Sequence, residues 1–198
     1  MIKQIDMSRT EYYQPLSWGL LCKECRHWLT ISGLAGIIMS ALLPWDMRLL
    51  AGWFLVLEVV MLSILDWQYG LLYDRLVIPL ALTGLISASA GFTLSVVDAL
   101  SGALLAGIFL WGLRMISKGG LGLGDVKMAM AMGLWLGWRA TVAALFMAFL
   151  VGGLLACCLL ISGNARQKTL PFGPCLALGA YLSFICGEKC WQAYASLL

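Results

Sequence analysis

Charged side chains are scarce in this chain of 198 residues. Asp, Glu, Lys and Arg make up 12% of the sequence, 62% is hydrophobic, and the mean hydropathy is +0.91. Because soluble globular domains carry about 25% charged residues, this composition excludes an ordinary soluble domain. It predicts an all-α, polytopic membrane protein whose main partner is the lipid bilayer. The net charge of +3 is spread over short loops, so no nucleic-acid partner is expected.

Histidine is almost absent as well. The single one, His27, precedes the first long apolar run. A Ser-His protease therefore has no base within the membrane, and a buried metal hydrolase has no histidine ligand there. A secretory signal peptide is also missing, because Lys3, Asp6 and Arg9 interrupt the first residues where an apolar core would lie. We expect the N-terminus to be retained in the cytoplasm.

Apolar runs are what the chain has in abundance. A helix needs about 20 apolar residues to cross a bilayer, and by this measure we expect about seven transmembrane helices. The runs are 29–45, 49–65, 76–92, 99–116, 126–138, 140–162 and 174–187. Residues 1–28 then form a short cytoplasmic segment, and residues 29–198 form the transmembrane domain. The run 126–138 is short, so a re-entrant segment is the alternative to a full span.

Lysines and arginines predict the orientation, because they favour the cytoplasmic side. If all seven runs span, ten of the 13 lie inside, and Arg48, Arg139 and Lys189 lie outside. If 126–138 is re-entrant, Arg166 and Lys168 lie outside. Arg139 and Lys189 then lie inside, and the count is again ten inside to three outside. Both alternatives put the end of the second run and the start of the fifth at the cytoplasmic boundary.

Two aspartates lie at that boundary. Asp66 follows the run 49–65, and Asp125 precedes the run 126–138. An ionisable group at the edge of the hydrocarbon is costly and indicates a functional site. Two carboxyl groups that share one proton can hydrolyse a peptide, since the ionised one activates water while the protonated one polarises the scissile carbonyl. The sequence therefore predicts a catalytic pair.

Other interpretations of the acidic residues remain open. Asp125 is well placed to cap a helix, and Asp66 could lie at a frayed helix end. Helix dipoles predict that Asp66, at a C-terminus, is more often protonated than Asp125. Glu58 is expected to be buried and either protonated or hydrogen-bonded, and Asp98 to cap the fourth helix. The competing functions are a cation-coupled transporter that uses Glu58, Asp66 and Asp125, or a noncatalytic membrane assembly subunit.

Four motifs carry a resemblance. Residues 122–125, Gly-Leu-Gly-Asp, followed by Lys127, resemble the GxGD signature of the type IV prepilin leader peptidases, which are membrane aspartyl proteases of bacteria. The segment 66–74 resembles the first catalytic block of that family, although Tyr73 replaces a proline. Residues 171–174, Pro-Phe-Gly-Pro, resemble the motif that introduces its last helix, and residues 22–25 resemble one of its two CxxC pairs.

The resemblance implies catalysis by Asp66 and Asp125, with support from four motif residues, Asp74, Gly122, Gly124 and Lys127. The implied reaction removes the basic leader peptide of prepilins or pseudopilins, which serve type IV pili or type II secretion. It takes place at the cytoplasmic face of the bacterial inner membrane and needs no cofactor. The oligomeric state is not implied.

The chain also departs from the family pattern ahead of its first span. The usual first transmembrane helix and most of the cytoplasmic domain are missing, so we expect a short form without N-methyltransferase activity. The four-cysteine zinc site of the family is incomplete too. Cys22, Cys25 and His27 would supply three zinc ligands, and the fourth would have to come from elsewhere.

Overall fold

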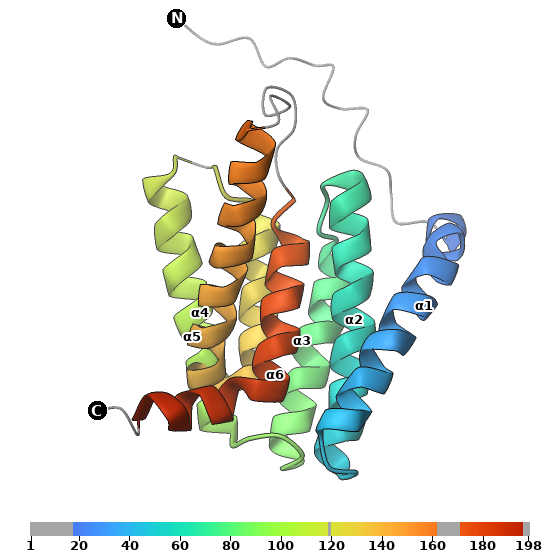
Figure 1. Cartoon of the computed structure of the whole chain (residues 1–198), viewed down its shortest axis with the longest axis vertical. Coiled ribbons are helices and arrows are strands. Elements are labelled where there is room, and N and C mark those ends of the chain that lie inside the picture. The colour runs from blue at the N-terminus through green and yellow to red at the C-terminus, as the bar shows by residue number, and fades with distance from the viewer. Residues whose placement is uncertain (1–17, 119, 162–170, 196–198) are drawn as a thin grey trace, which may run out of the picture.

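The structure is a computed structural model that describes residues 18–118, 120–161 and 171–195 (Figure 1). These residues form six helices and no strand, which confirms the all-α prediction. The helices are α1 (Trp18–Leu42), α2 (Met47–Tyr69), α3 (Asp74–Ser89), α4 (Val96–Ile116), α5 (Leu123–Ile161) and α6 (Gly173–Ala195).

Local signals begin and end these helices. Asp46 caps the start of α2, and Gly70, with a φ of 62°, ends it in the left-handed conformation typical of a helix C-terminus. The cap of α4 is Ser95, whose hydroxyl oxygen accepts a hydrogen bond from the amide of Asp98 at 3.2 Å. The prediction that Asp98 caps α4 is therefore wrong, because the helix begins before it and Asp98 lies in the first turn.

α5 consists of two antiparallel halves joined at Gly137. The backbone of Gly137 has φ 68° and ψ 175°, a conformation that is essentially restricted to glycine. The first half runs antiparallel to α4, where a Cβ on Gly102 would lie 2.5 Å from the carbonyl oxygen of Gly133. The second half packs against α6, where a Cβ on Gly179 would clash with the carbonyl oxygen of Ala144. The predicted runs 126–138 and 140–162 are these two halves.

α5 also lies at the centre of the bundle. It packs against α3, α4 and α6, whereas α1 lies at the periphery against α2 (Figure 1). Trp135 is almost fully buried in the first half of α5, and its indole nitrogen donates a hydrogen bond to the carbonyl oxygen of Leu80 at 2.9 Å. Small residues at the helix contacts and polar side chains that bond to backbone carbonyls are typical of packing in a membrane.

Three of the described helices, α2, α4 and α5, are long and apolar enough to cross a membrane by length and composition. The apolar part of α6 is shorter, at Gly173–Gly187. The protein is thus a multi-pass membrane protein, and the number of seven spans stays a prediction. α1 begins at Trp18 rather than at residue 29, so the predicted boundary between segments 1–28 and 29–198 falls inside a helix.

Candidate active site

Asp66 and Asp125 lie at the same end of the bundle. Asp66 is in the last turn of α2 and Asp125 is in the first turn of α5. The first turn of α6 lies toward the same end (Figure 1). Both side chains are buried, with 6% and 9% of their surface exposed. Such burial is rare for a carboxylate and needs polar partners.

Asp66 receives its partner from a distant segment of the chain. Its Oδ2 accepts a hydrogen bond of 2.8 Å from the backbone amide of Gly173, the first residue of α6. A Cβ on Gly173 would lie 2.6 Å from that oxygen, so only glycine fits. The amides at a helix N-terminus stabilise an anion. Asp66 thus lies at the C-terminus of α2, as predicted, and also contacts the N-terminus of α6, which the prediction did not include.

Asp125 is held by its own loop. Its Oδ2 accepts a hydrogen bond of 3.2 Å from the amide of Gly122, which is the reciprocal half of a capping box. Its Oδ1 is buried and has no hydrogen-bond partner among the described residues. The interpretation of Asp125 as a helix cap is therefore wrong, because α5 begins at Leu123 and Asp125 lies in its first turn. The contact with Gly122 accounts for one oxygen of Asp125 and leaves the other available for a proton or a substrate.

The structure brings the two carboxyl groups together. Asp66 and Asp125 lie near enough for their negative charges to repel each other, and the buried Cys175, in the first turn of α6, lies near both. Nothing in the sequence next to Cys175 links it to the aspartates, because α6 is remote from both of them in the chain. Within the described residues, no group of three or more His, Cys, Asp or Glu side chains could hold a metal ion.

Two further contacts join the loop after Asp66 to the start of α5. A Cβ on Gly124 would lie 2.7 Å from the Cβ of Leu72, so the glycine allows the loop 70–73 to pack closely there. Next to this contact, Nζ of Lys127 donates to Oδ1 and Oδ2 of Asp74 at 2.8 and 2.7 Å. Gly122, Gly124 and Lys127 thus lie at the start of the helix that carries Asp125, and Asp74, at the start of α3, is bound to Lys127.

The remaining polar candidates make other contacts. Glu58 is half-buried rather than buried, and it is hydrogen-bonded, as expected, because its Oε2 accepts from the hydroxyl of Thr83 on α3 at 2.8 Å. His27 is exposed on α1. The side chains of Cys22 and Cys25 lie outside the described residues, so the zinc prediction remains a prediction.

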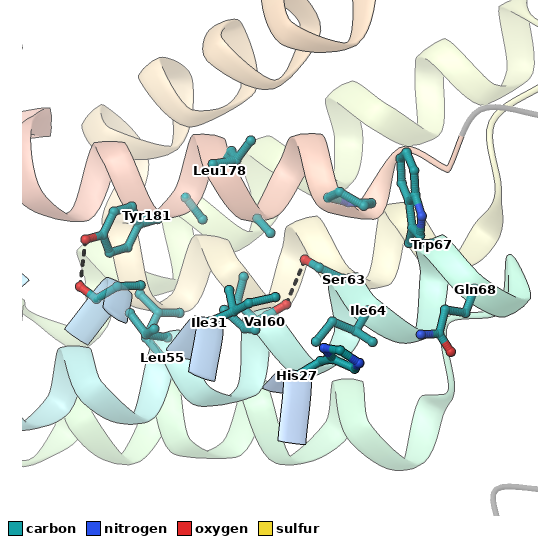
Figure 2. Close-up of a pocket in the computed structure, with 16 residues that line it drawn as sticks. His27, Ile31, Leu55, Val60, Ser63, Ile64, Trp67, Gln68, Leu178 and Tyr181 are labelled. Atoms are coloured by element: carbon teal, nitrogen blue, oxygen red, sulfur yellow. Dashed lines mark hydrogen bonds between the residues drawn. The ribbon is translucent and has the colours of Figure 1, made fainter. Parts of the chain in front are cut away.

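An apolar groove of about 570 Å³ runs between α1, α2 and α6 (Figure 2). Trp67 and Pro174, the chain neighbours of Asp66 and Gly173, line part of it. Elsewhere along the groove the hydroxyl of Tyr181 donates to the carbonyl oxygen of Ala35 at 2.8 Å. The groove therefore gives the candidate site an apolar flank.

Comparison with known proteins decides the family. Residues 49–157 match the type IV leader peptidase family, and this range includes Asp66 and Asp125. A prepilin leader peptidase/N-methyltransferase of Aeromonas salmonicida (strain A449) is 30% identical over 92% of this chain and 69% of the relative. The chain belongs to the type IV leader peptidase family.

Other leader peptidases agree with this assignment. The proteins of the same name from Aeromonas hydrophila and Pseudomonas aeruginosa are 32% and 31% identical. Each alignment covers 90% of this chain, with 68% and 67% of the respective relative. No solved structure matches. As a member of the leader peptidase family, the chain is a membrane protease.

Proposed function

We propose that this chain is an aspartic endopeptidase of the bacterial inner membrane that cleaves the basic leader peptide from type IV prepilins or pseudopilins. Asp66 and Asp125 form its catalytic dyad at the cytoplasmic face. The observation that carries the proposal is the nearness of two buried carboxyl groups from separate helices, one of which keeps an unpartnered oxygen. The relatives are prepilin leader peptidases, which supports the substrate class, and the distribution of Lys and Arg supports the orientation.

In the proposed mechanism the dyad shares one proton. Two neighbouring carboxyl groups resist double ionisation, so the pair holds a single negative charge. The ionised group takes a proton from water, and the water oxygen attacks the scissile carbonyl carbon. The protonated group donates to the carbonyl oxygen, and the amine leaves after it has gained a proton. No cofactor enters these steps.

The helix-dipole argument for a proton on Asp66 no longer holds. It assumed that Asp66 faces only a helix C-terminus, but the amide of Gly173 at the start of α6 also contacts it. Asp125 lies at the start of α5. Asp66 therefore lies at the C-terminus of α2 and also at the N-terminus of α6, so helix dipoles do not assign the shared proton to one member of the pair.

Co-expression with a prepilin tests the proposal. We expect Asp66→Asn and Asp125→Asn each to abolish leader removal, as seen by the mobility shift of the prepilin on gels. Asp46→Asn is the matched control, because Asn also caps helices and Asp46 is exposed at the start of α2. N-terminal sequencing of the product reports the cleavage position and any methylation. Full cleavage by either dyad variant would remove that residue from the mechanism.

A further inference from the structure

The helices that carry the two aspartates are held in place largely through other helices. α2 packs mainly against α1, α3 and α6, whereas α5 packs against α3, α4 and α6. The separation of Asp66 and Asp125 therefore depends on connections through α6 and through α3. On the α6 side the connection to Asp66 is the hydrogen bond from Gly173.

On the α3 side, two contacts connect the segments next to the aspartates. The loop 70–73 leaves the end of α2, and its Leu72 packs against Gly124. Asp74, the first residue of α3, then pairs with Lys127 of α5 through both carboxylate oxygens. These contacts differ physically, since the apolar one limits how closely the segments approach, while the ion pair resists their separation.

We propose that Asp74 and Lys127 are positioning residues that keep the start of α5, and with it Asp125, at the working distance from Asp66. This inference rests on the proposed aspartyl dyad. Lys127 is two residues after Asp125 in a helix and so projects about 200° around the axis from it. Its ammonium group is paired with Asp74. Lys127 therefore affects the reaction by holding Asp125 in position.

The exposure of the pair makes the connection sensitive to salt. The side chain of Lys127 is 50% exposed and that of Asp74 is 58% exposed. Dissolved ions screen the attraction between exposed charges. A positioning role therefore predicts that the geometry of the dyad, and not only the stability of the fold, responds to ionic strength.

Kinetics of prepilin cleavage test the role directly. We expect Asp74→Asn and Lys127→Gln each to lower kcat by about tenfold, because small displacements of catalytic groups are costly. KM should stay within about twofold, since substrate binding is untouched. The reversed pair, Asp74→Lys with Lys127→Asp, should restore kcat to within about threefold of the wild type. A raised KM in the single variants, with no recovery in the reversed pair, would mean that Lys127 binds substrate and would overturn the proposal.

The salt dependence of kcat is a second test. It does not require every variant to fold equally well, because each protein is compared with itself at low salt. High ionic strength should lower kcat of the wild type and leave the double neutral variant, Asp74→Asn with Lys127→Gln, unchanged relative to its own low-salt value. Equal salt responses in the two proteins would contradict the positioning role. Cleavage that persists in Asp66→Asn or Asp125→Asn would instead defeat the proposed dyad.

A distance measurement between the starts of α3 and α5 tests the positioning role without relying on prepilin cleavage. Spin labels are placed at Arg75→Cys and Leu123→Cys in a protein whose seven native cysteines are replaced. We expect a longer and broader distance distribution at high salt and in the double neutral variant. An unchanged distribution in both cases would overturn the proposal, whether or not the protein cleaves prepilin.

Discussion

Asp66 and Asp125 are both buried carboxyl groups at helix ends, yet different parts of the fold hold them. Asp66 depends on Gly173, a residue 107 positions away in the chain. Asp125 depends on Gly122, only three positions away. The position of Asp66 therefore reports on the packing of α6 against α2, whereas that of Asp125 reports on a local turn. Changes near the two residues should have different consequences.

The largest effect after the dyad itself is expected at Gly173. Gly173→Ala would place a Cβ 2.6 Å from Oδ2 of Asp66, so either the carboxyl group or the start of α6 has to move. We expect prepilin cleavage to fall by about a hundredfold or more. Gly153→Ala is the control, because a Cβ there meets nothing within 4 Å. Equal activity of the two variants in a cleavage assay would show that the contact with α6 does not matter.

A smaller loss is expected near Asp125. Gly124→Ala would bring a Cβ to 2.7 Å from the Cβ of Leu72. We expect about a tenfold loss of cleavage. Adding Leu72→Gly makes room and should recover most of the activity, although glycine loosens the loop. No similar second substitution can restore Gly173→Ala, because the added Cβ meets Asp66 itself, which cannot be shortened without loss of the proposed dyad. An absence of recovery would show that Gly124 acts through something other than the contact with Leu72.

Away from the site, only stability should change. Thr83→Val removes the hydroxyl that donates to Glu58 and should lower the free energy of unfolding by about 1 to 3 kcal/mol. Cleavage per folded molecule should stay the same. Thermal unfolding in detergent and the cleavage assay measure the two quantities. Glu58→Gln should likewise retain cleavage, whereas a transporter that relays cations through Glu58 would lose flux.

The smallest effect is expected from metal removal. The proposed reaction uses carboxyl groups alone, so a zinc chelator should leave cleavage unchanged in the wild type. The substitution Cys22→Ser together with Cys25→Ser should do the same. A chelator-sensitive activity that the cysteine variant lacks would instead support the zinc site of Cys22, Cys25 and His27.

The two aspartates were predictable from the sequence, whereas the long-range contact that holds Asp66 was not. Asp66 and Asp125 stand out because a charged group beside an apolar run is visible in the residues themselves. Gly173 could be recognised only as part of a motif, since its contact with Asp66 arises from the packing of α6. Gly137 was missed as the bend of α5, because the apolar pattern breaks at Arg139 while backbone conformation decides where a helix turns.

Helix ends were also only partly predictable from the sequence. The start of α1 at Trp18 was missed because a search for apolar runs finds the part of a helix that can lie in lipid. Backbone hydrogen bonds continue a helix through polar residues as well. The packing of α5 against three other helices, which places Asp125, likewise depends on contacts that no single segment contains.

The central claim is that Asp66 and Asp125 act as one dyad, and purified protein in liposomes tests it most directly. Single-turnover cleavage of a prepilin is measured for the wild type, Asp66→Asn, Asp125→Asn and the double variant. We expect each single variant to lose as much activity as the double variant, because residues that act as a unit are not additive. Wild-type cleavage in either single variant, or losses that multiply in the double variant, would contradict the shared mechanism.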